Sequence, residues 1–310
     1  MRSVVLANRG EIAVQTINEE LYQRFISYID ARPRTIETYS KAIRQLLKYF
    51  SLKGITQPTR EDILAYRDYL KEGHKPATVQ NYITATRLFF QWLEQERLYP
   101  NVANKIKGAR IEKGHKKDFL NSDQVKAVLG TVDTQSLQGL RDYAMIALMV
   151  TGGLRTIEIS RADIGDMREI AGQARLYIQG KGKEEKADYA VLQPEVETAI
   201  NAYLAERGET GREQPLFAST SNNSTGGRLS TRSISGIVKT WLKRAGYDSD
   251  RLTAHSLRHT AITLALMAGK PMREVQQFAR HTSPVITEVY AHDLERANNG
   301  CEEAIARAIF

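Results

Sequence analysis

The stretch Thr253-Ala-His-Ser-Leu-Arg-His-Thr260 opens the segment around which the rest of this 310-residue chain is organised. A helix is expected to begin at His255, and the segment closes with Arg280-His-Thr-Ser-Pro-Val-Ile-Thr-Glu-Val-Tyr290. Residues three apart share one face of a helix, so His255 and Arg258 are expected to point at one spot. Arginine offers donors suited to phosphate oxygens, histidine can donate to them or move a proton, and a tyrosine hydroxyl can attack phosphorus. This combination of arginine, histidine and tyrosine side chains suits phosphoryl transfer without a metal ion.

Length and composition set the broad class. A chain of 310 residues is long enough for two domains of roughly 150 residues each. No apolar run approaches the ~20 residues of a membrane span, and the first apolar run is too short for a signal peptide, so a cytoplasmic protein is expected. The single cysteine, Cys301, excludes an internal disulfide and a cysteine-built zinc site. No metal or other cofactor is expected.

The net charge of +8 is unevenly divided along the chain. Residues 1–117 hold 21 lysines and arginines against 12 acidic residues, whereas residues 118–310 hold 23 against 24. A basic N-terminal part is expected for a region that grips a phosphate backbone. A merely soluble basic surface remains an alternative on charge alone.

Residues 17–100 have the pattern of a four-helix module. Apolar side chains recur there at helical spacing, threonines are placed to cap the second and third helices, and prolines mark the end of the first helix and the start of the fourth. Residues 1–16 show no strong pattern and are expected to form an arm or a further helix. The boundary residues are Pro33, Thr35, Thr59 and Pro76.

Residues 101–117 are expected to form a basic linker. Six cations lie there with only one acid opposing them, and a linker of this charge between two domains is expected to cross a DNA backbone. A solvated linker without such a role is the alternative. The candidate DNA-binding residues are Lys105, Lys107, Arg110, Lys113, Lys116 and Lys117.

Residues 118–310 are expected to form a second domain, mainly helical with a small antiparallel sheet. Asn121 or Ser122 can cap its first helix. Two runs rich in β-branched and aromatic residues, 174–178 and 188–192, flank Gly180-Lys-Gly-Lys183, which is a strong hairpin signal. The hairpin is not a phosphate-binding P-loop, because the GxxxxGK[ST] spacing and a following helix are absent.

Two further side chains of this domain bear on the chemistry. Arg155 follows two glycines, and Glu158 lies three residues later, where its carboxylate can hold the guanidinium; a surface ion pair is the plain alternative. Lys181 lies between two glycines at the expected hairpin tip, and Lys183 competes with it for any role there. His259, beside Arg258, is more readily explained as a supporting or packing residue than as a catalytic one.

The chain resembles the tyrosine recombinase (phage integrase) family in the types and the order of its candidate residues, which are Arg155, Lys181, His255, Arg258, His281 and Tyr290. The run Thr151-Gly-Gly-Leu-Arg-Thr-Ile-Glu158 is similar to its first arginine motif, Ile178-Gln-Gly-Lys-Gly-Lys183 to its hairpin lysine motif, and the stretch from Thr253 to its HxxR box. His281, followed nine residues later by Tyr290, matches the spacing of its second histidine and nucleophile. One position departs from the family, because Arg280 stands where a glycine is usual.

The resemblance implies a fold and a set of roles. The fold is an all-α SAM-like four-helix core-binding domain followed by a mainly α, mixed α/β catalytic domain. The tyrosine attacks the scissile phosphate, the arginines and histidines stabilise the charge that builds on it, and the hairpin lysine protonates the departing 5′ oxygen, with no need for metal or ATP. The implied catalytic residues are Tyr290, Arg155, Lys181, His255, Arg258 and His281.

The resemblance further implies a site-specific DNA recombinase acting on double-stranded DNA through a 3′-phosphotyrosyl intermediate. Four protomers assemble on two sites and exchange strands through a Holliday junction, either in Xer-like resolution or in integration and excision of a mobile element. Accessory proteins or a partner recombinase are compatible with this interpretation. The apolar stripe of residues 291–310 predicts a tail that contacts a neighbouring protomer. The alternatives are a type IB topoisomerase-like enzyme and a DNA-binding relative without catalysis.

Overall fold

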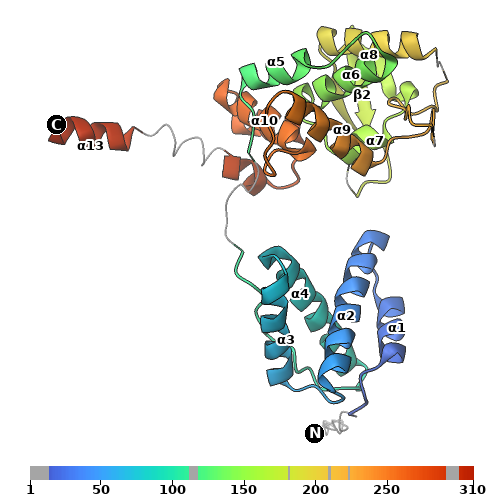
Figure 1. The fold of residues 1–310 in the computed structure, drawn as a ribbon, viewed down its shortest axis with the longest axis vertical. Coiled ribbons are helices and arrows are strands. Elements are labelled where there is room, and N and C mark those ends of the chain that lie inside the picture. Colours follow the sequence, from blue (N-terminus) through green and yellow to red (C-terminus); the bar gives the residue numbers. More distant parts are fainter. Residues whose placement is uncertain (1–13, 112–117, 181, 209–210, 223, 291–299) are drawn as a thin grey trace, which may run out of the picture. The chain divides into compact units, whose positions relative to one another are not determined.

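The computed structural model describes residues 14–111, 118–180, 182–208, 211–222, 224–290 and 300–310 (Figure 1). The chain divides into two compact units, Met1–Lys113 and Gly114–Phe310. None of the described helices is both long and apolar enough to cross a membrane.

The described residues of the first unit, 14–111, form four helices, as predicted. An aromatic cluster lies at its centre: the ring centroids of Phe25 and Phe89 lie 5.1 Å apart, and those of Phe25 and Trp92 lie 5.6 Å apart. Burial of such aromatic faces is the main term that holds a small helical domain together. The helices are α1 (Glu19–Tyr28), α2 (Pro33–Lys53), α3 (Arg60–Gly73) and α4 (Pro76–Gln95).

Three of the four predicted helix boundaries of this unit are confirmed. Thr59 caps α3 through a reciprocal capping box with Asp62, Pro76 is the first residue of α4, and α1 ends before Pro33. The prediction that Thr35 caps the second helix is wrong. Because proline fits the first turn of a helix, α2 already begins at Pro33, and Thr35 lies inside that turn.

The chain continues past α4 along the same unit. Ala103 and Ile106 are buried among the side chains of the helical core, so residues up to at least 106 pack with the helices. Lys105, Lys107 and Arg110 are exposed and lie outside any helix or strand. The other three candidate DNA-binding lysines, Lys113, Lys116 and Lys117, lie outside the described residues.

The described part of the second unit is mainly helical with one small sheet, which confirms the predicted fold class. Its helices include α5 (Ser122–Gly130), α6 (Leu137–Thr151), α7 (Thr156–Arg161), α8 (Pro194–Arg207), α9 (Thr231–Arg244), α10 (Ala254–Met267), α11 (Met272–Ala279) and α13 (Cys301–Ile309). Helix α6 is buried along most of its length and packs against α5, α8, α9 and α10. The core of the unit is therefore built around α6.

The sheet has three antiparallel strands in the order β1-β2-β3. Strands β2 (Gln173–Ile178) and β3 (Asp188–Val191) correspond to the two predicted runs, with Leu176 opposite Ala190. Strand β1 (Met167–Ile170) was not predicted. It is four residues long with mostly exposed side chains, so it lacks the apolar alternation that would reveal a strand.

A buried polar group ties α6 to α9. Arg141 and Asp142 form an ion pair at 2.7 Å with both side chains almost wholly buried, and the Trp241 indole donates to the other Asp142 oxygen at 2.8 Å. Arg141 also donates to the carbonyl of Ala218. Buried charges are tolerated when every polar group finds a partner, and these do.

Candidate active site

The turn between α6 and α7 places Arg155. Gly153 has a φ of +58°, which favours glycine, and a Cβ there would lie 3.0 Å from the Phe278 ring. Glycine therefore lets α11 approach this turn closely. Arg155 follows as the N-cap of α7, and Glu158 accepts from its backbone N–H and from its Nη1, each at 2.8 Å. The Glu158 side chain is fully buried, whereas the Arg155 side chain is 26% exposed.

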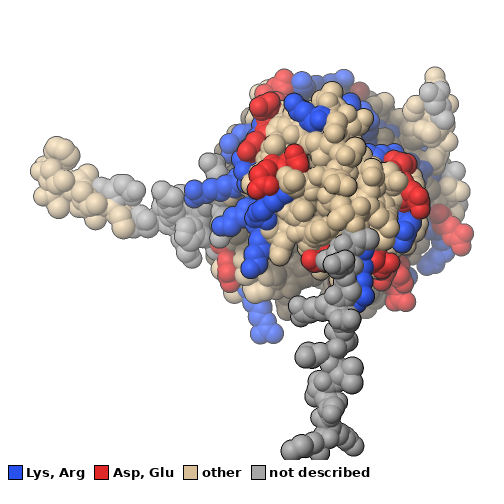
Figure 2. All heavy atoms as spheres, turned by 90° about the horizontal axis from the view of Figure 1, so that it is seen from below, with Lys and Arg blue, Asp and Glu red and all other residues tan. Residues whose placement is uncertain are grey.

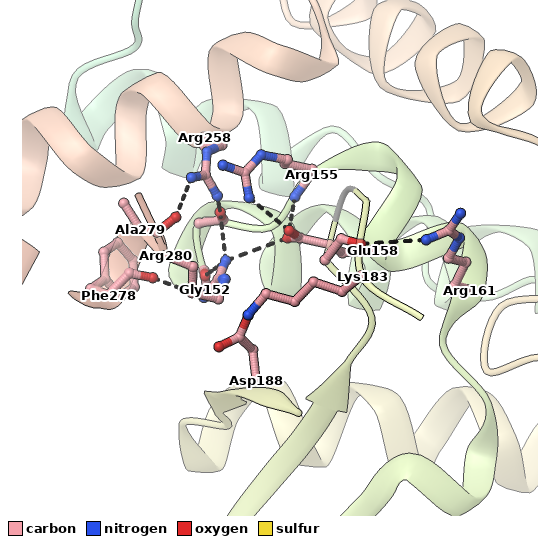
Figure 3. Close-up of polar contacts among 12 residues, drawn as sticks. Gly152, Arg155, Glu158, Arg161, Lys183, Asp188, Arg258, Phe278, Ala279 and Arg280 are labelled. Carbon is pink, nitrogen blue, oxygen red and sulfur yellow. Dashed lines mark hydrogen bonds and ion pairs between the residues drawn. The ribbon is translucent and has the colours of Figure 1, made fainter. Parts of the chain in front are cut away.

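Arg258 reaches the same turn from α10. Its side chain is buried, its Nη1 donates to the carbonyl of Gly153 at 2.5 Å, and its Nη2 donates to the carbonyl of Ala279 at the end of α11 (Figure 3). The guanidinium is thus held between two backbone segments. Arg155 and Arg258, which lie far apart in the sequence, come together at this turn.

Arg280 is a third arginine of this cluster. It is the C-cap of α11, with φ 53° and ψ 44°, a left-handed conformation that costs a non-glycine residue roughly 1 kcal/mol. Its guanidinium donates to the carbonyls of Phe278, Gly152 and Gly153, and lies 3.5 Å from Glu158 Oε2 (Figure 3). The side chain therefore points into the protein rather than into solvent.

Arg155 and Arg280 thus share the buried carboxylate of Glu158, whose charge also acts on Arg258. Burial, followed by the charges of Arg155 and Arg280, lowers the pKa of Arg258 to about 9, so Arg258 keeps its charge at neutral pH. Burial likewise lowers the pKa of Arg280, against the attraction of Glu158. The cluster is positively charged and its donors are fixed by backbone acceptors, which suits an anion such as a phosphodiester.

Tyr290 lies beside this cluster on a helical segment of residues 284–290. Its ring is buried and lies 6.3 Å from the His281 ring, nearly parallel to it. Burial raises the pKa of the Tyr290 hydroxyl, and the charges of Arg258 and Arg155 partly oppose that rise. The two arginines therefore act electrostatically on the hydroxyl that the sequence identified as the candidate nucleophile.

His281 is held in a neutral state. Its Nδ1 lies 2.9 Å from the Thr287 hydroxyl, one helical turn before Tyr290. Burial, followed by the charges of Arg258, Arg155 and Arg280, lowers the pKa of His281 to about 4. A neutral imidazole at pH 7 can donate one hydrogen bond and accept another. Thr287 was not predicted as a site residue, because a threonine inside a helix has no sequence pattern that would mark it as one.

Two histidines of α10 extend the ring cluster. The His259 ring lies 5.0 Å from Tyr290 and 4.8 Å from His255. His259 is buried and His255 is exposed, so His255 faces the solvent side of this cluster. His259 therefore packs directly against the candidate nucleophile.

The hairpin lysine, Lys181, lies outside the described residues. Described residues that precede and follow it make hydrogen bonds. Arg161 donates to the carbonyl of Gly180 at 3.4 Å, and Gln179 donates to the carbonyls of Lys183 and Glu184. Lys183, the competing candidate, forms an ion pair with Asp188 at 2.7 Å, as Figure 3 shows. Its ammonium is therefore bound to a carboxylate in this structure.

Of the six predicted catalytic residues, the structure brings five into one region: Arg155, Arg258, His255, His281 and Tyr290 interact electrostatically or through ring contacts. Among the described residues, no group of three or more His, Cys, Asp or Glu side chains is placed to hold a metal ion. On the face that Figure 2 presents, lysines and arginines lie among acidic side chains rather than in one basic stripe.

Comparison with known families gives two matches. Residues 118–296 match the model of the phage integrase family, and residues 20–99 match the N-terminal SAM-like domain of phage integrases. Among curated proteins, the tyrosine recombinase XerC of Pelotomaculum thermopropionicum is 29% identical over 277 residues, covering 85% of this chain and 89% of that protein. The tyrosine recombinase XerD of Listeria monocytogenes is 29% identical, covering 83% and 87%.

Solved structures share the fold. The XerH site-specific recombinase bound to its difH substrate, in a post-cleavage complex, has a TM-score of 0.72 at 22% identity, covering 86% of this chain and 80% of that one. A lambda integrase tetramer bound to a Holliday junction has a TM-score of 0.68 at 16% identity, covering 87% and 75%. At these identities the likeness concerns the fold.

Proposed function

Because the chain belongs to the phage integrase family and is a tyrosine site-specific recombinase, we propose that Tyr290 is the nucleophile with which it cuts and rejoins duplex DNA. The observation that carries the proposal is the convergence of Arg155 and Arg258 at one turn, within electrostatic reach of the Tyr290 hydroxyl. Fixed positive donors beside a hydroxyl nucleophile are what an attack on a phosphodiester requires.

In the proposed reaction, Tyr290 Oη gives its proton to the imidazole of His255 and forms a bond to the scissile phosphorus, while the bond between phosphorus and the 5′ oxygen breaks. Lys181 gives its proton to the departing 5′ oxygen, and a 3′-phosphotyrosyl linkage remains. Arg155 and Arg258 stabilise the charge on the non-bridging oxygens, while His255 and His281 add hydrogen bonds. The phosphotyrosyl bond keeps the energy of the broken one, so rejoining runs as the reverse attack.

The assembly follows from the same proposal. Four protomers on two DNA sites exchange strands through a Holliday junction, with the helical unit and the cations Lys105, Lys107 and Arg110 holding the DNA backbone. The exposure of these three cations and the excess of positive charge in residues 1–117 support this role. The solved complex of a related fold with a Holliday junction makes the same assembly reasonable here.

The test of the proposal is a covalent trap. On a nicked suicide substrate carrying the correct site, the wild-type chain should form a protein–DNA adduct that survives denaturation. Tyr290→Phe should abolish the adduct and leave DNA affinity unchanged, because only the attacking hydroxyl is lost. Absence of the adduct with the wild-type chain would exclude the enzymatic mechanism and leave a DNA-binding protein.

We also propose that the C-terminal tail, residues 291–310, docks on a neighbouring protomer. Ile305, Ile309 and Phe310 of the tail expose apolar side chains. A groove of about 610 Å³ between α5, the end of α6, α10 and α11 is lined mostly by apolar side chains, and its polar lining residues are Ser122, Lys126, Thr151, Lys270 and Glu274. Apolar surface of this kind gains stability when covered.

Deletion of residues 300–310 tests the docking. The truncated chain should still form the covalent adduct on a single site, but tetramer formation on two sites and recombination should fall together. Unchanged assembly and recombination after the deletion would contradict a docking role.

A further inference from the structure

Arg280 contacts the backbone and side-chain acceptors on which both candidate catalytic arginines depend. The carbonyl of Gly153 accepts from Arg258 Nη1 at 2.5 Å and from Arg280 Nη2 at 2.9 Å. The carboxylate of Glu158 accepts from Arg155 at 2.8 Å and lies 3.5 Å from Arg280 Nη2. One guanidinium is therefore coupled to the acceptor of each of the other two.

We propose that Arg280 is a positioning residue for the reaction, which fixes Arg155 through Glu158 and Arg258 through the Gly153 carbonyl. The inference rests on the proposed function of this site. The side chain joins the end of α11 to the α6–α7 turn, because it also donates to the carbonyls of Phe278 and Gly152. It thereby sets the distance between the segment that precedes His281 and the turn that carries Arg155.

A direct contact between Arg280 and DNA does not fit the geometry. Its side chain is only 9% exposed, its two terminal nitrogens donate to carbonyls, and its Nε is buried without a partner among the described atoms. Arg155, at 26% exposed, is the more accessible of the two. Arg280 therefore acts on the phosphate through its neighbours.

The backbone of Arg280 makes a clean test available. Its left-handed conformation favours glycine, so Arg280→Gly removes the side chain while relieving the backbone of strain. Arg280→Lys keeps the positive charge but has a single nitrogen, which cannot reach all four acceptors at once. Arg273, an exposed arginine on α11, the helix that Arg280 ends, supplies the matched control Arg273→Ala.

Single-turnover cleavage of the suicide substrate, with DNA affinity measured separately, is the experiment. Arg280→Gly should cleave bound DNA about 10- to 100-fold more slowly than wild type, the usual effect of losing a residue that orients a functional group. Its DNA affinity should stay within about twofold. Arg280→Lys should recover part of the rate, and Arg273→Ala should cleave bound DNA at the wild-type rate.

A second substrate separates positioning from packing. A methylphosphonate at the scissile position removes the negative charge that the arginines stabilise, so the rate ratio of wild type to Arg280→Gly should shrink on it. A packing defect would instead lower both rates by the same factor, and that equal loss would overturn the inference. A wild-type cleavage rate in Arg280→Gly, or a loss of affinity that accounts for the whole defect, would overturn it as well.

Failure of the inference is distinguishable from failure of the proposed function. A wild-type chain that forms no adduct refutes the nucleophilic role of Tyr290, whereas a normal wild-type adduct with an equally fast Arg280→Gly refutes only the role of Arg280. Thermal melting shows whether Arg280→Gly is folded. If it is not, Arg280→Lys decides, because a wild-type rate in that variant would contradict the need for the four contacts.

Discussion

At the scale of single residues, the candidate site has three arginines close together and one buried carboxylate to balance their charge. Arg155 and Arg280 donate to the one buried carboxylate, Glu158, while Arg258 and Arg280 donate to backbone carbonyls. Hydrogen bonds that the guanidinium donates to backbone carbonyls hold it in place without neutralising its charge. The excess positive charge is therefore preserved for a bound phosphate.

His281 gives a prediction about pH. Its pKa is lowered from 6.5 to about 4 by burial and by the three arginines, with His255 adding a smaller effect. Between these pH values the unfolded chain binds a proton at His281 that the folded chain does not bind. Stability contributed by the neutral ring is therefore present above pH 6.5 and lost as the pH falls towards 4.

The measurement is the pH dependence of the free energy of unfolding of the catalytic unit. Wild type should take up close to one more proton on unfolding between pH 6.5 and 4 than His281→Asn does. Identical proton uptake in the two proteins would mean that the folded ring titrates normally.

Lys181 yields a prediction about the leaving group. If it protonates the departing 5′ oxygen, Lys181→Ala should cleave an ordinary substrate about 100- to 10,000-fold more slowly. A 5′-bridging sulfur needs no proton to leave, so that substrate should restore most of the rate. Lys183→Ala is the control, since Lys183 is paired with Asp188 and should lose little. If Lys181→Ala cleaved the 5′-sulfur substrate as slowly as the ordinary one, Lys181 would not be the group that protonates the 5′ oxygen.

At the scale of elements, the buried pair between α6 and α9 should carry much of the stability of the catalytic unit. Asp142→Ala leaves Arg141 and the Trp241 indole buried without their acceptor, so the free energy of unfolding should fall by about 3–5 kcal/mol. Denaturation by guanidinium chloride measures it. Asp123→Ala, in an exposed pair with Lys126, should change stability by less than about 1 kcal/mol. A similar small change in both variants would contradict the account.

The observed helices and strands show which boundaries could be predicted from the sequence. Local chemistry marked the caps Thr59 and Asn121 and the start of α10 to within one residue, because capping depends on neighbours three residues away. It misplaced the start of α2, where proline and threonine offered competing signals, and it missed the exposed strand β1.

Part of the candidate site could be predicted from the sequence and part of it could not. The motif spacing identified Arg155, Arg258 and Tyr290, whose types suit the chemistry. The partners of Arg280 could not be predicted, because the carbonyls of Gly152 and Gly153 lie 128 and 127 residues away in the sequence. Only folding brings backbone acceptors to a side chain over such a separation.

At the scale of the whole molecule, the proposed assembly predicts which DNA products form. A plasmid with two copies of the correct site should be resolved into two circles, whereas a plasmid with no site should keep its supercoils. A type IB topoisomerase-like enzyme would relax the second plasmid as readily as the first, because it acts as a single protomer. Agarose gel electrophoresis of both plasmids distinguishes the two activities.

The central claim is that Tyr290, one of 14 tyrosines, bonds covalently to DNA. The most direct measurement is to trap the adduct on a suicide substrate, digest the protein and identify the DNA-linked peptide by mass spectrometry. A single modified peptide that carries the 3′-phosphate on Tyr290 is expected. Attachment at any other residue, or a modified peptide recovered from Tyr290→Phe, would contradict it.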